Sequence, residues 1–290
     1  MKKECTIKDF QNKFYSNDVC LEWLKNKFYP DGIFCKKCCK ITKHYKATDR
    51  PSYCCEFCRN HVHPTANTIF HKSPTPLKDW FYAVYLISST RCGISAKQLQ
   101  RELGVTYKTA WRMFHQIRAM LKEKQTQKDG IFEADETYIG GKHSGKRGRG
   151  SENKTCVFGI TQRKGKLVTK KIGNVKSSTL IPIIKENAVP NAIIYTDEFP
   201  PYDKLNKEGY IHHIINHANK VYVIDDCHIN NIEGFWSLLK RGINGVYHSV
   251  SSKHLDKYIN EYTFRYNNRN NDSPMFYLMM SQIRKDSSHQ

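Results

Sequence analysis

The chain has 290 residues, 39% of them hydrophobic and 26% charged, a composition that is ordinary for a folded protein and excludes wholesale disorder. Its 47 Lys and Arg against 27 Asp and Glu give a formal net charge of +20, so a polyanionic partner is expected. No apolar run approaches the roughly 20 residues of a membrane span, and the first residues do not resemble a signal peptide. We therefore expect nucleic acid, not a membrane, as the partner.

Most of the eleven cysteines precede Arg59, which marks residues 1–64 as a separate domain. Two Cys-x-x-Cys pairs lie in it, with sixteen residues between them, and two such pairs complete a tetrahedral site of four thiolates. Cys39 and Cys54 each adjoin a proposed ligand and would serve in a shifted register, but one register alone keeps the two-residue spacing in both pairs. The sequence therefore predicts a zinc ribbon holding one structural Zn²⁺. Its predicted ligands are Cys35, Cys38, Cys55 and Cys58.

Residues 74–123 change to a helical pattern, with apolar residues recurring at spacings of three and four. After a first helix, a second is expected at 95–103, capped by Ser95 and ended by Gly104, and a third at about 106–122. Helix, glycine-bearing turn and helix are typical of a helix-turn-helix DNA-binding segment. We expect cations of the third helix to face DNA, namely Lys108, Arg112, Arg118 and Lys122.

After a polar linker at 124–128, the pattern becomes strand-like. Strands are expected at 131–139, 156–161 and 167–172, then a helix at 178–187, a strand at 192–196, a short helix at 201–208, a strand at 212–215, and helices at 228–242 and 252–268. This order is similar to that of the ribonuclease H fold. We expect an α/β domain over residues 129–275 with a mixed five-stranded sheet. The glycine-rich, basic segment 140–154 predicts a mobile loop.

Three acids are candidate metal ligands: Asp135 inside an apolar strand, Asp197 at the end of a buried strand, and Glu233 beside the apolar stripe of a late helix. Carboxylates are the ligands that Mg²⁺ prefers, and two such ions can drive an in-line phosphodiester displacement. Alternation places Glu133 on the same face of the strand as Asp135, so the strand pattern alone does not select the ligand. Single acids at strand ends are more often caps or ion-pair partners than ligands.

At these residues the chain resembles the DDE insertion-sequence transposases of the ISXO-type group, which are related to the Merlin superfamily. The similarity covers about residues 28–269. The segments that carry it are 134–142 (ADETYIGGK), 195–198 (YTDE), 230–241 (NNIEGFWSLLKR), 258–262 (YINEY) and 264–267 (FRYN), together with the paired Cys-x-x-Cys motifs, 76–80 (PLKDW) and 104–118.

The resemblance implies a ribonuclease H-like catalytic domain in which Asp135 and Asp197 are the first two ligands of Mg²⁺ or Mn²⁺. For the third it implies Glu233, with Lys240 on the same helix, and it leaves Asn230 as a possible auxiliary ligand because some relatives carry Asn at the third position. The partner implied is double-stranded DNA, both element ends and target, bound by a homo-oligomer in the cytoplasm at the nucleoid, or in the nucleus of a eukaryotic host. Further cations expected to contact DNA are Lys142, Lys146, Arg147, Arg149 and Arg241.

We therefore expect a transposase that cleaves a strand at the element end and joins the freed 3′ hydroxyl to target DNA. Two alternatives remain open at this point. A zinc-ribbon and helix-turn-helix regulator would explain the charge and the cysteines, with its acids only structural. A domesticated, cleavage-only nuclease would keep the same catalytic residues.

Overall fold

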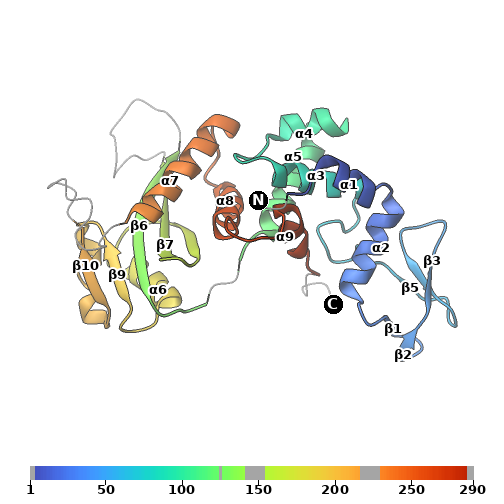
Figure 1. Cartoon of the computed structure of the whole chain (residues 1–290), viewed down its shortest axis with the longest axis horizontal. Helices are drawn as coiled ribbons and strands as arrows, with labels where there is room; N and C mark the ends of the chain where they lie inside the picture. The colour runs from blue at the N-terminus through green and yellow to red at the C-terminus, as the bar shows by residue number, and fades with distance from the viewer. Residues whose placement is uncertain (1–3, 124–125, 141–153, 216–228, 286–290) are drawn as a thin grey trace. The chain divides into compact units, whose positions relative to one another are not determined.

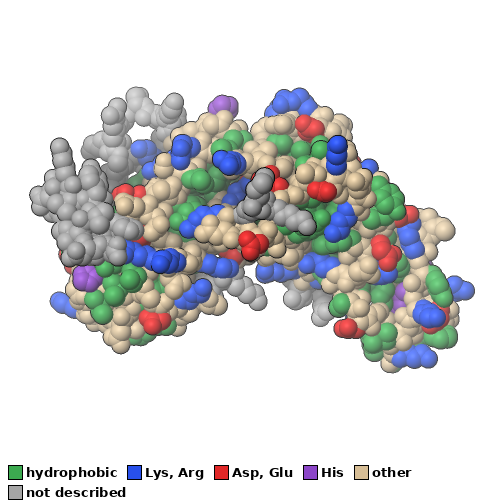
Figure 2. Space-filling model, in the orientation of Figure 1, with side chains coloured by type: hydrophobic (Ala, Val, Ile, Leu, Met, Phe, Trp, Pro, Cys, Tyr) green, Lys and Arg blue, Asp and Glu red, His purple; other side chains and the backbone are tan. Residues whose placement is uncertain are grey.

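The computed structural model describes residues 4–123, 126–140, 154–215 and 229–285. The chain divides into two compact units, residues 1–120 with 272–290 and residues 121–271. None of the helices within these described ranges is long and apolar enough to cross a membrane. Lys and Arg side chains lie on the surfaces of both units in the face shown in Figure 2. The predicted loop at 140–154 falls almost wholly outside the described residues.

The first unit has an aromatic core built by helices from both ends of the chain. Phe10, Phe14 and Phe276 are each 1–2% exposed, and the Phe276 ring lies 5.8 Å from each of the other two. The sequence patterns did not predict α1, α2 or α9, because these helices are short or nearly even in polarity. The helices of this unit are α1 Ile7–Lys13, α2 Asn17–Phe28, α3 Leu77–Ser89, α4 Ala96–Leu103, α5 Tyr107–Met120 and α9 Met275–Ser281.

Between α2 and α3 the chain forms two small antiparallel sheets, β1-β2 and β3-β4-β5. Tyr53 of β4 is buried with Leu21 and Ile33 and donates its hydroxyl hydrogen to Glu22 of α2 at 3.0 Å, which fixes the sheets against that helix. The strands are β1 Ile33–Cys35, β2 Lys40–Thr42, β3 His44–Lys46, β4 Tyr53–Cys55 and β5 His61–Val62.

The predicted pair of helices joined by a glycine-bearing turn is present as α4 and α5. The Ser95 hydroxyl accepts the amide hydrogen of Gln98 at 3.2 Å, and Gly104 ends α4 with φ +64°, a conformation that favours glycine. The expected apolar face of α5 is buried. The prediction that Arg118 faces outward was wrong: its side chain is 2% exposed and its guanidinium lies 5.2 Å from the Phe114 ring centroid.

The second unit is built on a mixed five-stranded sheet, which confirms that part of the predicted α/β fold. The strand order is β10-β9-β6-β7-β8, in which β7 is antiparallel to β6 and β8, whereas β9 is parallel to β6 and β10. The predicted short helix at 201–208 is instead two 3₁₀ turns, Pro200–Tyr202 and Asn206–Glu208. The strands are β6 Ile131–Gly140, β7 Lys154–Gln162, β8 Leu167–Ile172, β9 Ile193–Thr196 and β10 Ile211–Ile214.

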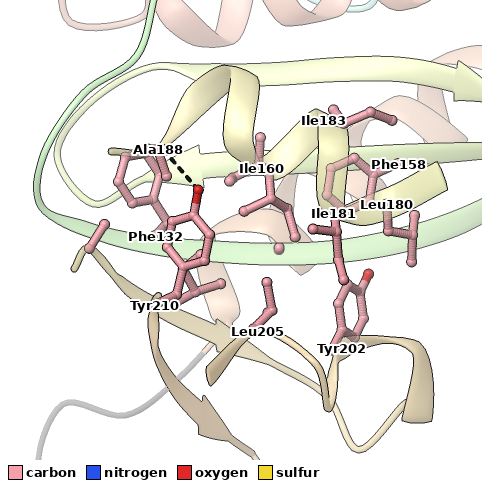
Figure 3. Close-up of a cluster of buried hydrophobic side chains, with 14 of the residues drawn as sticks. Phe132, Phe158, Ile160, Leu180, Ile181, Ile183, Ala188, Tyr202, Leu205 and Tyr210 are labelled. Carbon is pink, nitrogen blue, oxygen red and sulfur yellow. Dashed lines mark hydrogen bonds between the residues drawn. The ribbon is translucent and has the colours of Figure 1, made fainter. Parts of the chain in front are cut away.

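Helices cover both faces of this sheet (Figure 1). On one face, α6 Ser177–Asn187 and the 3₁₀ turns pack on Phe132, Phe158 and Ile160, a cluster closed by the hydrogen bond from the Tyr210 hydroxyl to the Ala188 carbonyl at 3.1 Å (Figure 3). On the other face, α7 Asn230–Gly242 and α8 Leu255–Asn267 pack in a separate cluster. A π-helical turn, Ile243–Tyr247, follows α7. Successive side chains of β6 point to opposite faces of the sheet, and its even-numbered residues lie in the α6 cluster. Its odd-numbered residues therefore face α7.

Candidate active site

The register between β6 and β9 brings Asp135 and Asp197 to the same level of the sheet. The two strands are parallel, and Glu133 pairs with Tyr195, so the residues two positions further along each strand correspond. Neighbouring strands lie about 4.8 Å apart. Asp197 follows the last residue of β9, Thr196, where the carboxyl end of a strand in an open sheet forms a ligand site.

Asp135 is half-buried and held in a defined orientation. One carboxylate oxygen accepts the backbone N–H of Glu136 at 2.8 Å, and the other accepts the indole N–H of Trp236 at 3.0 Å. Burial, followed by the negative charges of Glu136 and Asp197, raises the pKa of Asp135 to about 7. A carboxylate placed where burial and like charges oppose its ionisation is typical of a site that a cation completes.

Glu133, the other acid on this face of β6, is committed to the start of α7. Its side chain is fully buried, and its Oε2 accepts the backbone N–H groups of Asn231 at 3.0 Å and Ile232 at 3.2 Å. The Asn231 side-chain amide donates to it at 2.7 Å, and Arg163 Nε lies 3.3 Å away. These contacts separate the two acids that the strand pattern left equivalent: Glu133 accepts the first amides of α7, whereas Asp135 lies at the level of Asp197.

Glu136 points to the opposite face of β6. It is 9% exposed and accepts a hydrogen bond from the Tyr202 hydroxyl at 2.8 Å. Tyr202 is fully buried, and burial together with the charges of Glu136, Asp135 and Asp197 raises the pKa of its hydroxyl well above the ordinary value. The phenol therefore remains protonated and serves as the hydrogen-bond donor to Glu136.

The residues expected at the third position lie on α7 and are exposed. Glu233 and Lys240 are seven residues apart on this helix, and Asn230 is its first residue. Glu233 lies one turn before Trp236, the side chain that contacts Asp135. Within the described part of the chain, the Asp135, Asp197 and Glu233 carboxylates do not converge to within 4.8 Å of one another. Arg241, also exposed, donates to the Ser237 carbonyl at 3.3 Å.

Of the other cations expected to contact DNA, Lys108 is exposed on α5. Arg112 is half-buried, donates to the Ser73 hydroxyl at 3.3 Å, and its guanidinium lies 5.9 Å from the Trp80 ring centroid. The remaining four lie outside the described residues: Lys142, Lys146, Arg147 and Arg149.

The first unit brings together the sulfur atoms of Cys35, Cys38, Cys55 and Cys58, all within 4.8 Å of one another. The Cys35 and Cys58 sulfurs are 3.4 Å apart and those of Cys38 and Cys55 are 3.9 Å apart. Zinc–sulfur bonds of about 2.3 Å in a tetrahedron place neighbouring sulfurs about 3.8 Å apart, so the cluster fits a zinc ion. This is the only group of three or more potential metal-ligating side chains that converges in the described ranges.

The two halves of this cluster are built alike. Each Cys-x-x-Cys turn follows a strand, and the residue after it, Cys39 in one and Arg59 in the other, has φ of +53° and +58°. Cys39 therefore points away and donates to the Lys36 carbonyl at 3.5 Å. The backbone N–H of Cys58 and then the Thr42 hydroxyl lower the pKa of Cys55 to about 6, whereas hydrogen bonding with Cys58 and burial raise the pKa of Cys38 to about 12, so the thiols of the cluster titrate as a group.

Sequence patterns missed three residues of the site: Glu133 as the partner of α7, Trp236 as the donor to Asp135, and Tyr202 as the donor to Glu136. Trp236 was assigned only to the buried stripe of α7, where it does lie, at 4% exposed. Its place opposite Gly159, the strand partner of Asp135, depends on contacts between distant segments. A buried indole N–H usually needs a hydrogen-bond acceptor. The sequence could therefore have predicted that Trp236 donates to a buried acceptor, although not which one.

Residues 127–267 match the family described as the ISXO2-like transposase domain. A transposase-like protein of Haemophilus influenzae is 36% identical over 105 residues, covering 36% of this chain and 84% of that protein. A protein of the transposable element ISH50 of Halobacterium salinarum is 26% identical over 256 residues, covering 81% of this chain and 85% of that protein. These matches define the class, that of insertion-sequence transposases. Within it, the chain belongs to the ISXO2-like transposase family.

Two solved structures show weaker similarity. One is a simian T-cell lymphotropic virus intasome in complex with the PP2A regulatory subunit B56 gamma, with 12% identity and a TM-score of 0.31 over 63% of this chain and 65% of that one. The other is a pre-cleavage Mos1 transpososome, with 13% identity and a TM-score of 0.26 over 65% of this chain and 74% of that one.

Proposed function

We propose that this protein cleaves and joins DNA strands with a divalent-metal site built on Asp135 and Asp197, with Glu233 as the third acid. The observation that carries the proposal is the register of β6 and β9, which brings two acids that are 62 positions apart in the chain to one level of the sheet. Burial raises the pKa of Asp135, and the charges of Glu136 and then Asp197 raise it further, so the two aspartates interact. Membership of a transposase family supplies the reaction class.

The residues present suit Mg²⁺ or Mn²⁺. The Asp135 and Asp197 carboxylates lie at one level of neighbouring strands, and the charge of Asp197 opposes the ionisation of Asp135. A hard cation bound by both would remove that repulsion. When bound, a metal pair activates the attacking oxygen and stabilises the leaving oxygen of a phosphodiester displacement. The chain itself contributes orientation: the Glu136 amide and the Trp236 indole fix the Asp135 carboxylate, and each of its oxygens retains a lone pair for a cation.

Glu233 joins this site in the proposal by a movement of its exposed side chain or of α7 when DNA and metal bind. Lys240, on the same helix, is assigned to a DNA phosphate, and Asn230 to an auxiliary position beside the metal. Arg241 and the basic residues of the segment between β6 and β7 are further phosphate contacts. The strand order and directions of the sheet are those of a ribonuclease H-like domain, which supports the assignment of residues 129–275 to catalysis.

The first unit is assigned to DNA recognition. We assign Cys35, Cys38, Cys55 and Cys58 to one structural Zn²⁺, because four thiolates leave no open position for a reacting water. The α4-turn-α5 pair is assigned to the DNA groove, with Lys108 and Arg112 toward the phosphates. In this proposal, residues 1–64 and 74–123 act as a zinc ribbon and a helix-turn-helix, and the protein works as a homo-oligomer because two element ends must be held together.

The test is cleavage of a duplex that carries the cognate element end, with Mg²⁺ or Mn²⁺, by Asp197→Asn and Asp135→Asn. We expect the cleavage rate of each variant to fall at least about 10³-fold, because an amide in place of the carboxylate binds the metal ion poorly and the reaction depends on that ion. Glu186→Gln is the matched control, an exposed acid paired to Lys170 at 3.4 Å on the opposite side of the sheet. Cleavage by Asp197→Asn at the rate of the control would refute the assignment and leave a DNA-binding regulator.

A further inference from the structure

The start of α7 is capped by a side chain from another element. The first N–H groups of a helix have no partner within the helix, and the residue in the N-cap position, Ile229, supplies no capping hydrogen bond. Glu133 of β6 accepts two of these N–H groups, those of Asn231 and Ile232. A buried carboxylate at this end also has the favourable sign for the helix dipole.

A second contact further along fixes the same helix to the same strand. Asp135, two residues after Glu133, accepts the indole N–H of Trp236. Two residues of a strand advance about 6.7 Å, and the four to five residues from the capped amides to Trp236 advance about 6.8 Å along a helix. The matching rises mean that α7 runs alongside β6 with both contacts made at once (Figure 1).

Arg163 connects this cap to β9, the strand that Asp197 follows. It forms an ion pair with Glu133 at 3.3 Å, and its guanidinium lies 4.7 Å from the ring centroid of Tyr195, two residues before Asp197. The Tyr266 hydroxyl of α8 contacts the Asn231 carbonyl at 3.4 Å. Glu133 therefore contacts α7 directly and is connected to β9 through Arg163, and α8 contacts the same capped end of α7 through Tyr266.

We propose that Glu133 is a positioning residue for the metal site, which it serves by setting the level and rotation of α7 along β6. This inference rests on the proposed function, because it needs Asp135 and Asp197 to hold the metal. Glu133 does not ligate the cation. It holds the helix that orients Asp135 through Trp236 and that carries Glu233 and Lys240. Loss of the cap lets α7 shift along or rotate on the sheet, which weakens metal binding although every ligand is present.

The test compares Glu133→Gln with Glu261→Gln in the full-length chain. Glu261 is the matched control: it is also fully buried and paired to an arginine, Arg265 at 3.0 Å, but on α8. Binding of Mn²⁺ is measured by electron paramagnetic resonance without DNA, and the Mn²⁺ concentration for half-maximal cleavage is measured with DNA. We expect Glu133→Gln to weaken both about 10-fold or more, as loss of an orienting partner does, and Glu261→Gln to change neither by more than about 2-fold.

Equal shifts in the two variants, or no shift in Glu133→Gln, would overturn the inference. If Glu133→Gln does not fold, Asn231→Ala removes only the side-chain amide at 2.7 Å, and we expect a shift of about 3-fold in the same measurements. Asp135→Asn and Asp197→Asn are measured in parallel. If those two variants bind Mn²⁺ as the wild type does, the proposed function itself is rejected. If they lose Mn²⁺ binding but Glu133→Gln keeps it unchanged, only the role of Glu133 is rejected.

Discussion

Trp236 of α7 donates its indole hydrogen to Asp135 of β6 at 3.0 Å, so a residue of the hydrophobic layer also orients an acid of the candidate active site. The ring lies over Gly159, the β7 residue paired with Asp135. Packing and carboxylate geometry are therefore coupled at this point of the sheet.

Trp236→Phe removes the donor and keeps most of the apolar contact. Because the indole lowers the pKa of Asp135, its loss raises that pKa above about 7, and protons compete with the cation up to higher pH. We expect cleavage at pH 7 to fall about 10-fold and the acidic limb of the pH–rate profile to move to higher pH. A parallel drop at all pH values would instead indicate a packing defect.

Gly159→Ala tests the packing of the Trp236 ring against β7. An added Cβ would lie 2.8 Å from two carbons of the Trp236 ring, closer than real contacts allow. We expect a loss of about 1–3 kcal/mol in the free energy of unfolding, measured by denaturant titration, together with reduced cleavage. Gly173→Ala is the control, because a Cβ added there would have no other atom within 4 Å, and the change should be close to neutral. Equal stability of the two variants would contradict the contact.

Asp135→Asn should change how stability depends on pH in buffers without added divalent cations. The pKa of Asp135 in the folded protein, about 7, exceeds its value of about 3.9 in an unfolded chain. The folded state therefore holds the proton more tightly, and ionisation destabilises it as the pH rises from about 4 to about 7. We expect the Tm of the variant to exceed that of the wild type at pH 8, and the difference to shrink as the pH falls and to vanish below about pH 4. A Tm difference independent of pH would argue against a raised pKa.

Cys38→Ser and Cys39→Ser differ by one position and separate the two registers. We expect the first to lose the bound zinc and to lower the Tm, since the Cys38 sulfur belongs to the cluster. The second should keep one zinc per chain because its sulfur donates to the Lys36 carbonyl instead. Zinc is measured by atomic emission after dialysis. Retention of zinc by Cys38→Ser would exclude this cluster as the site.

Lys108→Ala should weaken binding to DNA of any sequence by a similar factor. The side chain is exposed on α5, and one lost phosphate contact reduces the slope of log K against log salt concentration by about 1. Lys8→Ala, which changes an exposed lysine of α1, is the control and should leave the slope unchanged. The measurement is fluorescence anisotropy with labelled duplexes at several salt concentrations, and an unchanged slope for Lys108→Ala would remove this residue from the interface.

The sequence by itself determined the features that have a local signature. Period-two and period-3.6 patterns located the five strands of the second unit and the α4, α5, α7 and α8 helices, because burial of one face leaves its period in the chain. The spacing of the Cys-x-x-Cys pairs selected the four sulfurs that converge, and alternation correctly placed Glu133 and Asp135 on one face of β6.

Tertiary structure alone decided which of those two acids accepts the first amides of α7 and which lies level with Asp197. The answer depends on the β6–β9 register and on where α7 begins against β6, which are contacts between segments far apart in the chain. It also decided that Arg118 is buried and that α9 packs with α1 and α3. The period of apolar residues in a segment shows only that one of its faces is buried. Which residues pack against that face is decided by the tertiary structure.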